Sequence, residues 1–390
     1  MIKTRELFVN DRQAIAITSM TRVDKKIYLG LTGGANILAV YDILNDTLEV
    51  KENIFPWITD RGYCTKIHNA MGQLPDGSII MGEGNHFTWD GLPVTVNYFN
   101  NELPESMLAR KQAQGFPDVK YTDFCLKNLE NWNRSQSDSG GRIVRYYPDL
   151  ERCEIIGFLP NFLYIQSMVI DKKRERGFGH TIPDNHFFMV DFKQNKIYAF
   201  GRISDYAHHN MVISPDGVCF GGWLDKADNS LKLFRFDPAR GVPEYLNKVI
   251  LADIGRKVAG NQGIDEWIVT SSGRIFMGTV ADSLLFEFHY KEERFELIGK
   301  LAEGGRVTSL SEDDNGIIWI TADYPHMRIL RFDPCKKESA ITDLGRVNET
   351  YERCYFHTGC WHDGKLYLGE TDGFVPSLHI ITLDSIQACG

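Results

Sequence analysis

The sequence lacks several features that would assign it to a membrane, secreted or nucleic-acid-binding class. No stretch approaches the ~20 apolar residues of a membrane-spanning helix, and the opening residues MIKTRELFVNDRQ contain no apolar core of a signal peptide. The eight cysteines form no CxxC pair and no metal-ligand spacing, which is typical of buried thiols in a reducing compartment. A formal net charge of -9 argues against a nucleic-acid partner. We therefore expect a cytoplasmic protein with neither a membrane nor a nucleic-acid partner.

A strand-turn-strand-turn-strand pattern recurs along the chain, with about 40 to 50 residues in each copy, as in propeller blades. Each copy has a turn of Asp, Gly, Asn or Lys, a short β-rich run, a loop and a second β-rich run. The pattern predicts an all-β fold, a seven-bladed β-propeller. Its hairpins begin at Val23, Leu74, Ile170, Ser214, Thr270, Glu312 and Trp361.

The two ends of the chain support this count of blades. The last copy supplies three strands, near Tyr355, Leu366 and Leu378, and no fourth strand follows Asp384. The segment from Thr4 to Asn10 precedes the first blade, so we expect it to form the outer strand of the last blade and to close the ring. Strand periodicity continues past the midpoint without a linker, which predicts a single domain over residues 1–390.

Blade two carries a long insertion, from about residue 87 to residue 140. It contains PESMLARKQAQ, with proline at a natural helix start, and DFCLKNLENW, which begins with an Asp cap. A long segment of this kind in a compact domain is often a functional lid. We therefore expect a partly helical insertion that covers the mouth of the propeller channel.

Polar side chains recur at two points of the repeat that face the same side of a propeller. Eight of the eleven histidines fall near these points, which is more than scatter predicts. A single histidine is more often structural, and we expect this of His186 and His326. The starts of inner strands carry His68, Gln166, His208, His209 and His357. The ends of second strands carry Glu83, His86, His180, Trp223, Tyr324 and Glu370.

Several of these residues have simple structural interpretations beside the functional one. Trp223 and Tyr324 are aromatic side chains that would line the channel wall. Glu83 and Glu370 are expected to be solvated loop carboxylates. Trp223, Tyr324 and Glu370 are also candidates for substrate binding, together with Arg61, Gln166, His208, His209 and His357. All of these assignments depend on the predicted propeller face.

The segment KIHNAMGQLPDGSIIMGEGNH, with His68 and His86 on either side of a strand, resembles the propeller-fold polysaccharide lyases. These include the ulvan lyases and the rhamnosyl-glucuronate lyases, and Tyr164 at the next blade extends the resemblance. In that family an arginine follows one strand later and contacts the uronate carboxylate, whereas this chain has His180. The resemblance implies cleavage of an acidic oligosaccharide or polysaccharide by β-elimination.

β-Elimination at a 4-linked uronate requires three functions: neutralisation of the carboxylate, a base for the C5 proton and an acid for the departing O4. The resemblance implies His68 or His86 as the neutralising group, Tyr164 as base or acid, and His180 in place of the arginine. Arg61 is the best nearby cation. These assignments make His68, His86, Tyr164 and His180 the candidate catalytic residues.

A metal is a further possibility that the residues leave open. Oligogalacturonate lyases are also propellers and hold a divalent metal with His and Gln ligands. Gln166, His180, His209 and His357 resemble a weaker form of that set, for Ca²⁺, Mn²⁺ or Zn²⁺. Spacing alone does not establish the site, so the cofactor is unknown at this level.

Two other functional classes fit the same scaffold. A glycoside hydrolase needs two facing carboxylates, for which Glu83, Asp184, Asp282 and Glu370 are candidates. A noncatalytic propeller that binds carbohydrate or protein needs aromatic side chains without perturbed acid-base groups. The richness in histidine favours the lyase.

Overall fold

The computed structural model describes most of the chain outside one long segment and several shorter ones. In the residues that it describes, the regular structure is almost entirely β-strand, with one short 3₁₀ helix over Pro148–Leu150. Within the described part, no helix has the length and apolarity needed to span a membrane. The described residues are 2–11, 14–33, 36–52, 54, 65–85, 140–160, 163–182, 185–204, 210–250, 263–303, 305–323, 326–336, 341–349, 351, 354–371 and 376–383.

By its internal contacts the chain divides into two compact units. Unit one comprises Met1–Leu7, Ser204–Leu368 and Leu378–Gly390, and unit two comprises Phe8–Ile203 and Gly369–Ser377. Each unit is built from antiparallel sheets of neighbouring strands. The single-domain expectation for residues 1–390 stays a prediction.

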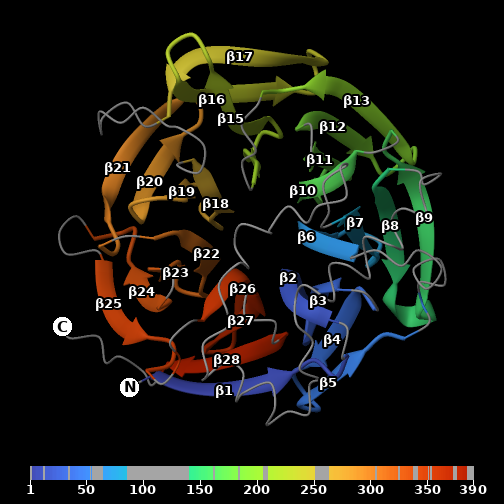
Figure 1. The fold of residues 1–390 in the computed structure, drawn as a ribbon, viewed down its shortest axis with the longest axis vertical. Helices are drawn as coiled ribbons and strands as arrows, with labels where there is room; N and C mark the ends of the chain where they lie inside the picture. The colour runs from blue at the N-terminus through green and yellow to red at the C-terminus, as the bar shows by residue number, and fades with distance from the viewer. Residues whose placement is uncertain are drawn as a thin grey trace, which may run out of the picture. The chain divides into compact units, whose positions relative to one another are not determined.

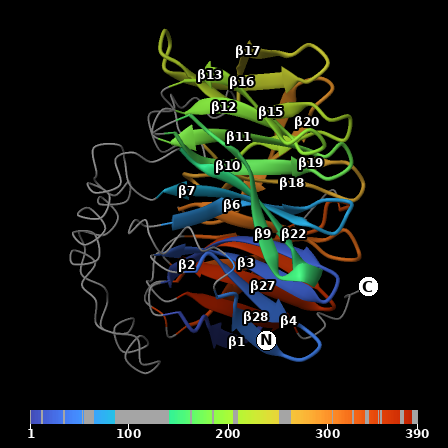
Figure 2. The same cartoon turned by 90° about the vertical axis from the view of Figure 1, so that its right-hand side faces the viewer.

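Unit two contains three groups of four strands (Figure 1). The first two groups are joined, because the end of β3, which also pairs with β2 and β4, pairs with β6 through Thr32 and Lys66. Figure 2 shows the third group as neighbouring strands, β10 to β13. The groups are β2 (Ala14–Val23), β3 (Lys26–Gly33), β4 (Leu38–Asp42) and β5 (Thr47–Val50); β6 (Thr65–Gln73), β7 (Ile79–Asn85), β8 (Arg142–Tyr147) and β9 (Arg152–Phe158); and β10 (Tyr164–Asp171), β11 (Arg176–Ile182), β12 (His186–Asp191) and β13 (Lys196–Arg202).

The strands of unit one form four sheets of four strands. In the last of them β1, from the start of the chain, pairs with β28, as the sequence predicts. The sheets are β14 (Val212–Ile213), β15 (Cys219–Asp225), β16 (Ser230–Asp237) and β17 (Val242–Val249); β18 (Ile264–Val269), β19 (Ile275–Thr279), β20 (Leu284–His289) and β21 (Arg294–Lys300); β22 (Val307–Glu312), β23 (Ile318–Ala322), β24 (Arg328–Phe332) and β25 (Ile341–Arg346); and β26 (Tyr355–His362), β27 (Lys365–Thr371) and β28 (Ser377–Leu383) with β1 (Ile2–Phe8).

Side-chain contacts also join β1 to the segment that follows β25. The Thr4 hydroxyl donates to the Val347 carbonyl at 2.9 Å, and the Tyr351 hydroxyl bonds the Glu6 carboxylate at 2.5 Å. The predicted outer strand, Thr4 to Asn10, is thus confirmed, with its bounds moved to Ile2–Phe8. In the described residues the chain therefore forms seven successive groups of four strands, which confirms the predicted repeat.

The turn between the first and second strands of every group contains a residue in the left-handed backbone region. Four of these residues are glycines, which adopt positive φ at little cost; Gly77, for example, has φ 86°. The turns predicted from the sequence therefore adopt the left-handed conformation at these residues. The positive-φ residues are Asp24, Gly77, Glu175, Gly217, Gly273, Gly316 and Asp363, the last followed by a positive-φ Gly364.

Apolar side chains from successive sheets form the cores. One cluster in unit two joins Ile143 of β8 to Ile165 and Phe188 of the next sheet. In unit one, Phe220 of β15 lies in one cluster with Phe286 of β20. Each sheet is therefore covered by its neighbour, which accounts for the nearly continuous burial along strands such as β19 and β23.

Nearly all of the predicted, partly helical insertion lies outside the described residues, which stop at Asn85 and resume at Gly140. The residues that flank it on both sides are described. A Cβ on Gly84 would overlap the Ile165 carbonyl oxygen, and one on Gly141 would lie 2.9 Å from the Ile165 backbone nitrogen. Backbone from both ends therefore lies directly against the start of β10.

This close approach gives a test of the packing. We expect Gly84→Ala to destabilise the protein by about 3 kcal/mol, because the obstructing atom is a backbone carbonyl that cannot rotate away. Urea unfolding followed by circular dichroism measures the change. Gly299→Ala is the matched control, since its new methyl would meet only the flexible end of Ile341, at 3.2 Å. Equal stability of the two variants would contradict the packing described.

Candidate functional site

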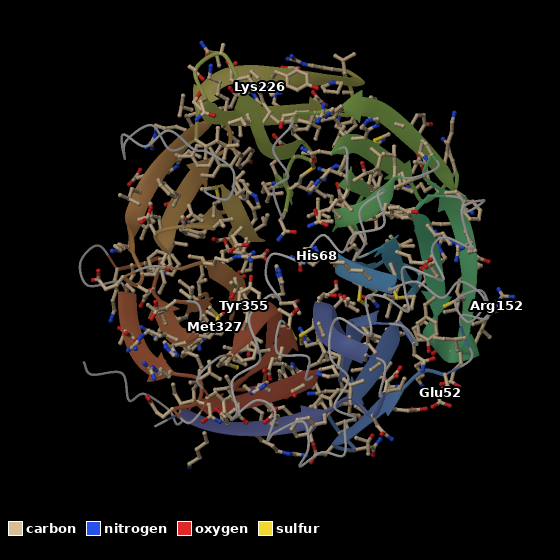
Figure 3. All side chains as sticks on the ribbon, in the orientation of Figure 1. Glu52, His68, Arg152, Lys226, Met327 and Tyr355 are labelled. Atoms are coloured by element: carbon tan, nitrogen blue, oxygen red, sulfur yellow. The ribbon has the colours of Figure 1, made fainter. Side chains whose placement is uncertain are left out.

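In unit two the starts of β6 and β10 and the end of β11 bring together four of the predicted residues. His68 lies on β6 (Figure 3), and its Nδ1 is 2.8 Å from the Gln166 carbonyl oxygen on β10. Tyr164 begins β10, and His180 of β11 lies opposite Ser167 in the ladder. All four are buried, with exposed fractions between 0% and 9%. Residues that the repeat places at equivalent points of the blades therefore lie at the same end of neighbouring strands in unit two.

The hydrogen bond of His68 determines the chemistry of its ring. A carbonyl oxygen only accepts, so Nδ1 carries a proton and donates it. Nε2 is then the nitrogen that takes up or releases a proton when the ring changes charge. A backbone carbonyl that orients a histidine in this way is a common device for presenting the other ring nitrogen.

A buried ion pair lies at the same edge of the second four-strand group. Glu83 of β7 and Arg142 of β8 are opposite each other in the ladder, and Arg142 Nη1 is 3.4 Å from Glu83 Oε2. Burial lowers the pKa of Arg142 to about 10, which leaves it positively charged at neutral pH. The pair joins the last strand before the insertion to the first strand after it.

The expectation that Glu83 and Glu370 are solvated is wrong. Their exposed fractions are 2% and 0%. They lie within strands β7 and β27 rather than in loops, because these strands continue past the predicted ends. Both carboxylates are therefore buried within strands and are not solvated loop groups.

Other predicted site residues are spread through the structure or lie outside its described part. Trp223 of β15 packs edge-on against Tyr245, and its indole N–H donates to the Leu246 carbonyl at 3.3 Å, so contacts within its own sheet fix it. His357 lies on β26 of unit one and is 7% exposed. Six candidates lie outside the described residues: Arg61, His86, Asp184, His208, His209 and Tyr324.

The predicted metal set is not tested as a whole. His209 lies outside the described residues, and His357 belongs to unit one whereas Gln166 and His180 belong to unit two. The divalent cation stays a prediction.

Unit one has a polar cluster at the starts of its own inner strands. Arg306, just before β22, forms a two-pronged pair with Asp265 of β18, with Nε–Oδ2 and Nη2–Oδ1 distances of 2.8 and 2.5 Å. The Asn210 side-chain nitrogen, just before β14, lies 3.0 Å from both the Asp265 carbonyl oxygen and Glu266 Oε2. Asn210, Asp265 and Arg306 are buried, and Glu266 is partly exposed.

Aromatic rings extend this cluster to β26. The Arg306 guanidinium lies 5.2 Å from the centre of the Tyr355 ring, and Tyr355 packs edge-on against His357. Tyr355 and Met327, both labelled in Figure 3, belong to one apolar cluster. The guanidinium is thus held between a carboxylate and an aromatic face.

The surroundings of Glu266 favour its neutral form. Burial raises the pKa of Glu266 to about 8, and the neighbouring Asp265 charge adds to the rise. The Arg306 charge and the hydrogen bonds from the Trp267 backbone N–H and the Asn210 side chain lower this pKa and so oppose the rise. A carboxyl group with a pKa near the working pH is suited to proton transfer.

Sequence reasoning missed this second cluster. Its residues occupy the same place in the repeat as His68 and Gln166, in the segments HHNM, GIDEW and GGRVT. Histidines stand out in the sequence because they are few, whereas an Asp–Arg pair next to a glutamate has no distinctive spacing. Position in the repeat was the signal that would have found Asn210, Asp265, Glu266 and Arg306.

Comparison with known proteins identifies the fold and no more. No protein-family profile and no curated protein sequence matches the chain. Among solved structures, it is similar to virginiamycin B lyase from Staphylococcus aureus, with a TM-score of 0.61 and 11% identity over 98% of this chain and 100% of that one. A catalytically inactive His-to-Ala variant of that lyase, with quinupristin, gives the same TM-score at 10% identity, over the same shares of both chains.

Similar structures also include proteins of other kinds. YCF48 bound to a D1 peptide has a TM-score of 0.56 and 9% identity, over 98% of this chain and 97% of that one. The C-terminal WD40 domain of Sif2 has a TM-score of 0.52 and 10% identity, over 96% and 97%. The fold is an all-β propeller. At these identities the likeness does not extend to function, and none of these neighbours is an ulvan or rhamnosyl-glucuronate lyase.

The raised pKa of Glu266 predicts how stability changes with pH. Between about pH 4.5 and pH 8 the unfolded chain releases this proton while the folded chain keeps it, so the free energy of unfolding falls as pH rises. The fall amounts to about 3 to 5 kcal/mol. Urea unfolding of the wild type and Glu266→Gln at pH 5, 7 and 8.5 measures it.

The variant has no titrating group at this position, so its stability should lack this component of the pH dependence. The difference in stability between the two proteins should therefore change with pH. It is added to a pH-independent loss in the variant, because the glutamine amide nitrogen meets the N–H donors of the Asn210 side chain or the Trp267 backbone. Parallel pH profiles would show that Glu266 has an ordinary pKa.

Proposed function

We propose that the protein is a carbon–oxygen lyase that cleaves a uronate-containing oligosaccharide or polysaccharide by β-elimination. The observation that carries the proposal is the His68–Gln166 hydrogen bond, which leaves Nε2 of a fixed histidine as its proton-exchanging atom. Tyr164 and His180 lie at the same edge of unit two. Histidine and tyrosine at one site are suited to a reaction in which one proton is removed and another is delivered.

The proposed reaction balances as follows. A base takes the C5 proton of the uronate, the C5–H electrons form the C4=C5 double bond, and the C4–O4 bond breaks. An acid then protonates O4. His68 and Tyr164 are assigned to these two proton transfers, and the fixed Nδ1 proton of His68 favours proton transfer at Nε2 over a purely neutralising role.

The carboxylate of the substrate must be neutralised for C5 to lose its proton. Positive charge at this edge of unit two comes from Lys66, two residues before His68 on β6, whereas Glu83 balances the charge of Arg142 at the start of β8. His180 stands where the resembling family has arginine. An acidic glycan is therefore the proposed partner, although the whole chain carries a net charge of -9.

The solved propellers give limited support. A lyase occurs on this fold, and its histidine-to-alanine variant is described as catalytically inactive. The acidic-sugar substrate comes instead from the sequence resemblance and from the residue types at the site. YCF48, described as bound to a peptide, represents the noncatalytic alternative on the same fold.

The reaction can be tested directly. We expect incubation with 4-linked glucuronide and galacturonide oligosaccharides to produce ultraviolet absorbance from a C4=C5 unsaturated uronate. New reducing ends without that absorbance would indicate a glycoside hydrolase. Binding of these oligosaccharides without turnover would indicate a noncatalytic carbohydrate-binding propeller.

A variant test separates catalysis by His68 from a structural role. His68→Ala is expected to lower kcat by ~100-fold or more, as for loss of an acid-base group. It also costs about 1 to 3 kcal/mol of stability, because His68 is buried and bonded. Turnover is measured on protein shown to be folded by circular dichroism.

His379→Ala is the matched control. His379 is also fully buried, but it belongs to unit one, where it contacts Glu6 of β1 and Phe356 of β26. We expect it to lose stability and keep kcat. Equal kcat values for folded His68→Ala and wild type would exclude the proposed mechanism.

A further inference from the structure

The first strand of each four-strand group in unit two carries a bulge. On β2, Thr18 is an extra residue in the ladder with β3. On β6, residues 68–70 stand opposite a single residue of β7, Gly82. On β10, Gln166 is an extra residue in the ladder with β11. Bulges re-aim side chains and are frequent next to active sites, and here one of them contains the proposed catalytic histidine.

The Thr18 hydroxyl connects the first of these bulges to the second. Its Oγ1 lies 2.6 Å from the Ile67 carbonyl oxygen on β6 and 2.8 Å from Thr32 Oγ1 on β3, and both threonines are buried. A carbonyl oxygen only accepts, so the single hydroxyl proton of Thr18 points to Ile67, and Thr32 donates to Thr18. The residue types thus determine the direction of both hydrogen bonds.

The Ile67 carbonyl belongs to the peptide group that carries His68. This group is planar, so a hydrogen bond that fixes its oxygen also fixes the Cα atom of His68. The Ala70 N–H donates to Ser19 Oγ of β2 at 3.2 Å, which holds the backbone beyond His68. Asn69 has φ 42°, a left-handed conformation that asparagine tolerates better than most residues. Bonds from β2 therefore hold both ends of the segment that carries the His68 side chain.

We propose that Thr18 is a positioning residue for His68, an assignment that rests on the proposed role of His68 in proton transfer. β6 lies between β2 and β10 (Figure 1). On the β2 side Thr18 fixes the backbone of His68, and on the β10 side the Gln166 carbonyl accepts the Nδ1 proton of the ring. A displaced backbone would move Nε2, and a catalytic atom misplaced by about 1 Å can cost ~100-fold in rate.

Unit one contains an equivalent pair of threonines. Thr308 is the extra residue in the ladder of β22 with β23, its Oγ1 lies 3.0 Å from Thr321 Oγ1, and both side chains are buried. The second contact of Thr308 is the Met327 sulfur, at 3.4 Å. Thr308→Val is therefore a matched control for Thr18→Val. Each variant loses a buried hydrogen bond between two threonines, but the Thr18 hydroxyl also bonds the backbone next to His68.

The tautomer of His68 is the first readout, and it requires no turnover. Two-bond ¹H–¹⁵N correlation spectra of ¹⁵N-histidine-labelled protein show which ring nitrogen carries the proton, and His68→Gln identifies the resonances. With the ring neutral, we expect wild type, Thr18→Ser and Thr308→Val to carry the His68 proton on Nδ1. Thr18→Val is expected to give a mixture of the two neutral tautomers, because the displaced ring no longer holds its bond to the Gln166 carbonyl.

The kinetic readout separates positioning from stability. With a 4-linked glucuronide oligosaccharide, Thr18→Val is expected to lower kcat by ~10-fold or more with little change in KM, because proton transfer is affected more than binding. Thr18→Ser keeps the hydroxyl and should keep kcat. Thr308→Val should lose stability to urea as Thr18→Val does and keep the wild-type kcat. Ser19→Ala releases the Ala70 N–H and replaces Thr18→Val if that variant does not fold, with the same changes expected.

The inference is contradicted if folded Thr18→Val, or Ser19→Ala in its place, keeps the wild-type tautomer of His68 or, with an active wild type, the wild-type kcat. An equal loss of kcat in Thr308→Val would also contradict it, since general loss of packing would then be the cause. Absence of lyase turnover in the wild type would count against the proposed function alone, because the tautomer of His68 still tests the contact from Thr18.

Discussion

Burial of apolar side chains between successive sheets is the interaction on which the rest of this structure depends. Ile143, Ile165 and Phe188 in unit two, and Phe220 with Phe286 in unit one, join neighbouring four-stranded sheets. A sheet of four short strands cannot bury both of its faces alone. Each sheet is therefore held by the next one, and the strand ends are fixed as a consequence.

Fixed strand ends explain why polar groups can be buried at the starts of the inner strands. His68 bonds the Gln166 carbonyl of the next inner strand, and Arg306 bonds Asp265 of the preceding one. Each bond links two sheets and satisfies groups that would otherwise be costly to bury. The same positions supply structural connections and the groups with acid-base chemistry.

The two units use this position differently. In unit two it carries a histidine with a determined proton on Nδ1, beside Tyr164. In unit one it carries a paired arginine and a glutamate whose neutral form is favoured.

The sequence by itself determined the repeat. Turns such as PDG at Gly77 and Gly217 require positive φ, and alternating apolar residues on either side require strands, so both are local properties. It also placed His68, Gln166 and Tyr164 at equivalent points of the repeat. The bounds of β1 differ by two residues at each end from the prediction, because strand ends depend on pairing with β28.

Only the tertiary structure decided which polar groups meet and in what state. Burial of Glu83 depends on how far β7 extends beside β8, which no local pattern encodes. The partnership of Asp265 with Arg306 joins residues 41 positions apart, and the raised pKa of Glu266 arises from that environment. Pairing and desolvation are properties of neighbours brought together by packing, so the chain order alone does not contain them.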